Sequence, residues 1–310
     1  MEMLLILLLA LIIDLALGDP PNVIHPVAWL GKVVSFLEKR CLSKSHAIQF
    51  LYGIGIVLFT TALFTVPAYF ILVSLKSLSA VVYVLVGTIF FKLTFSLRGL
   101  RQAALKVKEL LLEDKLDEAR FELRALVGRD TRNLTEPLLV SATVESVAEN
   151  ANDSFVAPLF YFLIFGIPGA IAYRVVNTLD AIIGYHGKYE YLGKFACRLD
   201  EVLNFIPARL TALLLVSASF LSGGDGRKSW QVACGEHVKT ESCNAGWPMA
   251  AIAGALNVQL EKVGHYKLGK ANALLIPETI DASLKLMQIA MLVWVLICFT
   301  IGGIRFVLTA

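Results

Sequence analysis

The sequence contains little charge for its length. Asp, Glu, Lys and Arg make up only 17% of its 310 residues, whereas 57% are hydrophobic and the mean hydropathy is +0.69. Because soluble domains carry about 25% charged residues, this composition excludes an ordinary soluble domain and indicates an integral membrane protein. The net charge is only +3, and the basic residues lie in the loops between apolar runs, so we expect no nucleic-acid partner.

Cysteine is also scarce. The five cysteines form no CxxC pair and adjoin no histidine cluster, so we expect neither a zinc site nor a disulfide framework. The N-terminal segment MEMLLILLLALIIDLALGDPP lacks the basic start and the small-residue cleavage site of a signal peptide. We therefore expect this segment to be retained in the membrane.

Long apolar runs define the candidate membrane segments. A spanning helix needs about 20 apolar residues, and five runs approach or reach that length: residues 3–18, 50–75, 78–97, 205–221 and 286–307. Another run, 155–173, is divided by the sequence GIPG at 166–169 into pieces shorter than a bilayer, which favours a re-entrant hairpin.

The loops between these runs favour one orientation. The hydrophilic loops 98–154, 174–204 and 222–285 each carry several Lys and Arg residues, so we expect them to face the cytoplasm. The sequence therefore predicts an all-α, polytopic protein of the inner or plasma membrane. We expect four to six membrane segments in a single domain, residues 1–310, with any active site on the cytoplasmic side.

An acidic stretch, ESVAENANDSF at residues 145–155, precedes the interrupted apolar run. On a helix, Glu145, Glu149 and either Asn152 or Asp153 lie on one face, because residues four and seven or eight apart superimpose. Such carboxylates repel one another unless a divalent metal, an Arg or a shared proton lies between them. The alternative is a solvated helix face that ends in capping Asn and Asp residues.

Charged and amide side chains recur in the mostly apolar sequence that follows the acidic stretch. Near membrane segments, leaving them without partners costs several kcal/mol each, so we expect them to contact one another or a ligand. Arginines suit phosphates and acids suit metals. The simpler explanations are snorkelling of Arg to lipid headgroups, a structural salt bridge or a buried hydrogen bond. The residues are Arg174, Asn177, Asp180, Arg198, Asp200, Asn204 and Arg209.

Three further stretches carry polar residues of the same kind. Asp19 and His25 follow the first apolar run, although a lone His is more often structural than catalytic. Arg129 and Asp130 precede the acidic stretch, and the segment Asn244-Ala-Gly-Trp247-Pro supplies an amide and an indole. The indole offers a flat face to a planar ligand, or else belongs to a simple Trp-Pro turn.

Six segments, in chain order, resemble the signature segments of the CbiB/CobD family of cobalamin biosynthesis, adenosylcobinamide-phosphate synthase. They are LIIDLALGDPPNVIHPV, VGRDT, VESVAENANDSFVAPLFY, PGAIAYRVVNTLDAIIGY, RLDEVLNFIPARLTALLL and NAGWPMAAIAGALNV. The resemblance implies an ATP- and Mg²⁺-dependent ligase. It would join adenosylcobyric acid to (R)-1-amino-2-propanol phosphate, or a related amino-alcohol phosphate, through an acyl phosphate, giving adenosylcobinamide phosphate.

The resemblance also implies roles for the polar residues. Glu145, Glu149 and Asp153 would handle Mg²⁺ and the nucleotide phosphates, and Asp180 and Asp200 would bind a second metal or accept the ammonium proton. The remaining residues would bind substrates and their phosphates: Asp19, His25, Arg129, Asp130, Asn150, Arg174, Asn177, Arg198, Asn204, Arg209, Asn244 and Trp247.

Two rival functions remain open at this level. A transporter of a cobalamin precursor would explain Asp14 within an apolar run and the broken segment 155–173. Against it, the sequence shows no internal repeat, and the charged motifs lie beside the apolar runs rather than spread through their middle. A non-catalytic scaffold for corrin enzymes would explain a membrane protein with hydrophilic loops, but would leave the acidic and Arg clusters without a role. The expected partners are the corrinoid and amino-alcohol phosphate substrates and the lipid bilayer, with a homo-oligomer or other enzymes of the pathway as further candidates.

Overall fold

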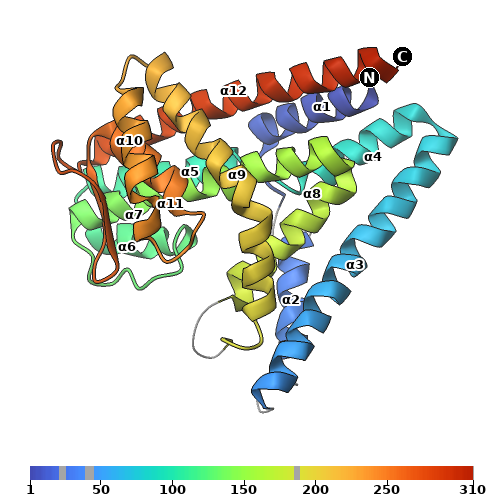
Figure 1. Ribbon diagram of the computed structural model, residues 1–310, viewed down its shortest axis with the longest axis horizontal. Coiled ribbons are helices and arrows are strands. Elements are labelled where there is room, and N and C mark those ends of the chain that lie inside the picture. Colours follow the sequence, from blue (N-terminus) through green and yellow to red (C-terminus); the bar gives the residue numbers. More distant parts are fainter. Residues whose placement is uncertain (21–25, 39–44, 185–188, 310) are drawn as a thin grey trace. The chain divides into compact units, whose positions relative to one another are not determined.

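The computed structural model describes all residues except 21–25, 39–44, 185–188 and 310, and is built almost entirely of helices (Figure 1). This confirms the all-α prediction. His25 lies outside the described residues.

The chain folds into two compact units, each assembled from segments far apart in the sequence. Unit 1 comprises Met1–Ser96, Ala157–Leu203 and Cys298–Ala310, and unit 2 comprises Leu97–Val156 and Asn204–Ile297. The single domain expected from the sequence stays a prediction.

Unit 1 is formed by apolar helices. They are α1 (Glu2–Leu17), α2 (Pro26–Glu38), α3 (His46–Leu78), α4 (Ala80–Lys92), α8 (Ala157–Ile183), the start of α9 (Lys194–Leu221) and the end of α12 (Pro277–Thr309). Helix α1 packs on α4, while α2 and α3 pack on α8. The core of α2, α3 and α8 contains Leu30, Val57 and Leu179. Many large apolar side chains on the outer faces stay exposed, as expected for helices that contact lipid.

Among the residues that the structure describes, four helical segments are long and apolar enough to cross a membrane: His46–Leu78, Glu136–Ile183, Lys194–Leu221 and Pro277–Leu308. The predicted spans 50–75, 205–221 and 286–307 lie within three of them. The predicted span 3–18 corresponds to α1 with 16 residues, and 78–97 to α4 with only 13. At 1.5 Å per residue, 13 residues reach about 20 Å, which is less than the roughly 30 Å hydrocarbon core.

The GIPG sequence at 166–169 interrupts the helical geometry as expected. Gly166 adopts φ 70° and ψ −161°, a conformation that favours glycine, and helix continues on both sides of it. The re-entrant path of residues 155–173 stays a prediction.

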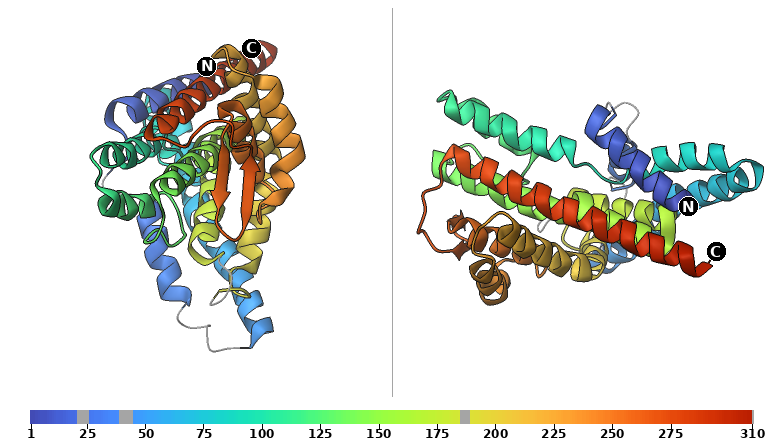
Figure 2. Two further views of the ribbon diagram at one scale, coloured as in Figure 1. Left: turned by 90° about the vertical axis from the view of Figure 1, so that its left-hand side faces the viewer. Right: turned by 90° about the horizontal axis from the view of Figure 1, so that it is seen from above.

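Unit 2 surrounds a buried helix. Helix α7 (Glu136–Ala151) continues into a π-helical turn, η2 (Asn152–Val156). Around α7 lie α5 (Arg98–Leu112), α6 (Leu116–Glu122), η1 (Leu123–Ala125), α11 (Gly246–Leu256) and the antiparallel strands β1 (Gln259–Lys262) and β2 (Tyr266–Gly269). Helix α10 (Gly226–Glu236) packs on α11 and leads into η3 (His237–Lys239). Figure 2 shows the hairpin as two arrows.

Candidate active site

The acidic stretch lies at the end of α7 and in η2. Residues 139–148 of α7 are all buried, and Glu145 is only 4% exposed, whereas Glu149 is exposed and Asp153 half-buried. The solvated-face alternative is therefore wrong for Glu145. A π-helical turn is rare and occurs often at functional sites, so the chain departs from regular helix within the stretch that carries the predicted acids.

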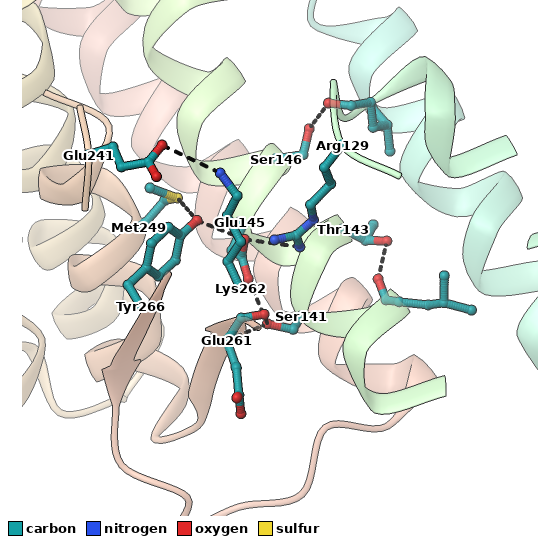
Figure 3. Close-up of polar contacts among 12 residues, drawn as sticks. Arg129, Ser141, Thr143, Glu145, Ser146, Glu241, Met249, Glu261, Lys262 and Tyr266 are labelled. Carbon is teal, nitrogen blue, oxygen red and sulfur yellow. Dashed lines mark hydrogen bonds and ion pairs between the residues drawn. The ribbon is translucent and has the colours of Figure 1, made fainter. Parts of the chain in front are cut away.

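Glu145 is held by three side chains that point toward it (Figure 3). The Arg129 Nη2 lies 3.2 Å from one carboxylate oxygen, and the Tyr266 hydroxyl donates to that oxygen at 3.0 Å. The Ser141 hydroxyl, one turn earlier on α7, donates to the other oxygen at 2.7 Å. A buried carboxylate requires such compensation of its charge. The Ser141 oxygen also accepts a bond from the Glu261 backbone N–H at 2.7 Å, which fastens β1 to α7.

These contacts bear on the predicted metal site. The Glu145 oxygens already accept hydrogen bonds from a Tyr and a Ser, and one of them forms an ion pair with an Arg. Within the described ranges, no group of three His, Cys, Asp or Glu side chains is placed to hold a metal ion. The structure therefore does not bring Glu145, Glu149 and Asp153 together as a preformed set of ligands.

Tyr266 stays a hydrogen-bond donor in this cluster. Burial is the largest of the causes that raise the pKa of Tyr266 well above its usual value, and the nearby charge of Glu145 is the next largest. The phenol is thus protonated throughout the physiological range.

We expect Tyr266→Phe to lower the free energy of unfolding by about 1.5–3 kcal/mol, because it removes a bond to a charged acceptor. The loss should shrink above pH ~10, since the unfolded phenol ionises near pH 10 while the folded one does not, and wild-type stability falls as pH rises through that range. Thermal unfolding at pH 8 and above pH 10 tests both points. Tyr69→Phe, at an exposed tyrosine, is the control; equal losses in the two variants would contradict the assignment.

Asn152 links η2 to α9. Its amide nitrogen donates to Asp153 at 2.7 Å and to Asn204 at 2.8 Å, and its oxygen accepts from the Thr211 hydroxyl at 3.0 Å. The predicted residues Asp153 and Asn204 are therefore brought together. Asn150, by contrast, donates back to Ser146 on its own helix, at 3.0 Å to the backbone oxygen and to the hydroxyl.

The predicted residues Arg209, Asn244 and Trp247 also meet within unit 2. The Arg209 guanidinium donates to Asn244 at 3.3 Å, stacks 3.6 Å above the Phe205 ring and lies 5.2 Å from the Trp247 ring centroid. The His237 ring stacks on Trp247 with centroids 3.9 Å apart. One face of the indole predicted to receive a planar ligand is therefore covered by His237.

Asp130 lies at the surface of unit 2. Arg132 donates to both carboxylate oxygens at 2.6–3.1 Å, and these bonds hold the pKa of Asp130 well below its usual range. Asp130 is thus ionised and paired with its near neighbour, whereas Arg129 beside it turns to Glu145.

The other predicted residues lie in unit 1. Arg174 donates to Asn177 at 3.3 Å, and Asn177 donates to Asp200 at 3.2 Å, so these three form a chain of contacts between α8 and α9. Arg198 is 71% exposed and pairs with Glu201 at 2.7 Å. Asp180 is half-buried on α8, close to the backbone of Gly184.

Asp19 lies beside a buried ion pair at the end of α1. The Lys92 ammonium on α4 lies 2.7 Å from Asp19 and 2.9 Å from Asp14, and the Ser96 hydroxyl also donates to Asp19. Lys92 and Asp14 are 4% and 1% exposed. Asp14, which favoured a transport pathway at the level of sequence, is therefore paired within unit 1.

Comparison with known proteins decides the family. A family model described as CobD/Cbib protein matches residues 7–295. The chain belongs to the CobD/CbiB family. The cobalamin biosynthesis protein CobD of Dehalococcoides mccartyi is 56% identical over 306 residues, 99% of each chain. Probable CobD proteins of Methanothermobacter thermautotrophicus and Pyrococcus furiosus are 42% and 44% identical, over 85% and 84% of this chain and 86% and 85% of theirs. No solved structure matches.

In this CobD/CbiB chain, several residues of the polar clusters were missed by the sequence prediction. The spacing of Ser141 and Glu145, four residues apart, could have indicated their contact. No sequence signal points to Tyr266, which lies 121 residues from Glu145 and meets it only through the hairpin. Lys92 lies within the apolar run 78–97, which the sequence predicts to span the membrane, so its pairing with Asp14 and Asp19 was not predicted.

Proposed function

We propose that this membrane protein is an ATP-dependent amide ligase of cobalamin biosynthesis. It would join adenosylcobyric acid to (R)-1-amino-2-propanol phosphate, or a related amino-alcohol phosphate, and release adenosylcobinamide phosphate on the cytoplasmic side. Family membership supports the pathway, and the six segments named above support the reaction.

One observation in the structure carries the assignment of the site. The acidic stretch is not a uniform solvated face: Glu145 is buried against Arg129, Glu149 is exposed one turn later, and Asp153 lies half-buried in a π-helical turn. The stretch thus combines a fixed guanidinium with two more accessible carboxylates, which suits a substrate that carries phosphates and a cation.

The donor set fits Mg²⁺ only in part. Mg²⁺ is usually held by one or two carboxylates together with substrate phosphates and water, rather than by a complete protein cage. Glu149 and Asp153 fit that requirement, whereas Glu145, occupied by Arg129, Ser141 and Tyr266, does not. Bound Mg²⁺ would offset the charge of the ATP phosphates.

The proposed reaction needs an activated carboxylate. An oxygen of the adenosylcobyric acid carboxylate attacks the γ-phosphorus of ATP and ADP leaves, which gives an acyl phosphate. The amine then attacks the acyl carbon, loses a proton to a base and expels inorganic phosphate. Arg129 and Arg209 supply guanidinium groups for the phosphates in unit 2. The phosphate-binding role of Arg198, and the roles of Asp180 and Asp200 as base or second metal site, stay predictions.

A direct assay tests this function. Purified protein in detergent should convert adenosylcobyric acid, aminopropanol phosphate and Mg·ATP to an amide product, with ADP formed in equal amount. ADP formed without the amine should be much slower and give no amide. A well-folded protein that forms no amide would refute the ligase and favour the scaffold or the transporter.

A further inference from the structure

A cavity in unit 1 lies beside Arg174 and is otherwise apolar. Its volume is about 330 Å³, within the size range of small-molecule pockets. It is enclosed by α2, residues 63–71 in the second half of α3, the end of α4 and the second half of α8. Its apolar lining includes Leu30, Phe64, Phe90 and Val175.

The polar side chains of the lining are few. The Thr94 and Thr178 hydroxyls each donate to a backbone oxygen of the preceding helical turn at 2.7 Å. The cavity is lined by no Asp or Glu among the residues that the structure describes. The guanidinium of Arg174 is therefore the charged group of this cavity.

Arg174 is not fully satisfied by the protein. Its Nη1 donates to the neutral Asn177 at 3.3 Å, and its buried Nε has no hydrogen-bond partner in the described parts of the chain. Arg174 is half-buried, and a partly desolvated cation without an anion is unfavourable, while a planar guanidinium is well suited to a phosphate. The cavity thus lacks an anion at one point and offers apolar surface elsewhere.

The rim of the cavity points to lipid as the source of that anion. Leu63 and Ile71 line it and are 43% and 44% exposed on α3, a helix long and apolar enough to cross a membrane. Trp29, which is 47% exposed, also lines it, and Trp side chains concentrate at the headgroup level of membranes. A small amino-alcohol phosphate would leave its ammonium and hydroxyl groups in apolar surroundings.

We propose that this cavity binds an anionic phospholipid, with its phosphate on Arg174 and an acyl chain along the apolar wall. The absence of a carboxylate from the described lining disfavours a zwitterionic headgroup, whose cation would have no partner. Arg174 is then a lipid-binding residue. This role differs from the sequence prediction, in which Arg174 binds the polar substrates. This inference does not depend on the proposed ligase reaction.

The test measures binding of defined lipids to the delipidated full chain in detergent. Phosphatidylglycerol should raise the melting temperature of the wild type, whereas phosphatidylcholine should not. Any stabilisation by inorganic phosphate or aminopropanol phosphate should be the same in Arg174→Met as in the wild type, because these ligands would bind outside this cavity. Arg174→Met removes the charge, and Ala68→Phe fills the cavity. Each should weaken the apparent affinity for phosphatidylglycerol at least about tenfold. Ala172 lines a different cavity of unit 1, so Ala172→Phe is the matched control. This variant should bind phosphatidylglycerol as the wild type does.

Several results would overturn the proposal. Equal stabilisation by the zwitterionic and anionic lipids would remove the headgroup assignment. Stabilisation by inorganic phosphate or aminopropanol phosphate that is lost in Arg174→Met would make Arg174 a polar-substrate site. Should Ala68→Phe fail to fold, Arg174→Met and Arg174→Lys decide the matter through the phospholipid that co-purifies. The Lys variant should retain phosphatidylglycerol and the Met variant should not; equal retention by both contradicts the proposal.

Discussion

Replacing Glu149 with Gln is expected to lower turnover about 10²-fold or more, the usual size of an effect on acid-base or charge-handling groups, with little change in the melting temperature. Glu149 is exposed at the end of α7, so replacing it should disturb the fold of unit 2 less than replacing the buried Glu145. The substitution removes the charge and keeps the shape. Steady-state amide formation and thermal unfolding of the same preparation provide the two measurements.

For Glu145, one turn earlier on α7, we expect a loss of stability instead. Glu145→Gln should lower the melting temperature, because Arg129 loses its partner within a buried cluster. Glu109→Gln, at an exposed acid on α5, should change neither quantity. Wild-type turnover in Glu149→Gln would remove Glu149 from the site, and a large fall in its melting temperature would make its role structural.

Replacing Lys92 with Met is expected to destabilise unit 1 by about 3–5 kcal/mol, because it leaves the charge of Asp14 buried without a partner. The two side chains are 4% and 1% exposed and lie 2.9 Å apart. Asp19 would lose its contact with Lys92 in the same step. The expected observation is a strongly lowered melting temperature in detergent.

Two further variants separate the ion pair from general disturbance of the helices. The double variant Lys92→Met with Asp14→Leu should recover most of the lost stability, because apolar residues can replace a buried pair at little cost. Lys76→Met should have little effect, since Lys76 is 63% exposed and its pair with Glu2 is 3.5 Å long. A double variant no more stable than Lys92→Met alone would contradict this explanation.

Much of the fold follows from local properties of the sequence. Apolar runs form helices wherever they are long, so α3, α9 and α12 contain the predicted spans 50–75, 205–221 and 286–307. Gly166 departs from helical geometry at the GIPG sequence for an equally local reason. The short length of α4 was not predictable from hydropathy, because the polar end of that run is set by the contacts of Lys92 with α1.

The sequence by itself determined that this protein is an all-α membrane protein, that it resembles the CobD/CbiB family, and where its polar residues lie along the chain. Only the tertiary structure decided which of them meet. Glu145 contacts Arg129 and Tyr266, His237 covers a face of Trp247, and Arg174 lines an apolar cavity. The physical reason is range: hydropathy and helical spacing act over a few residues, whereas the partner of a buried charge is chosen by packing between segments that are distant in sequence.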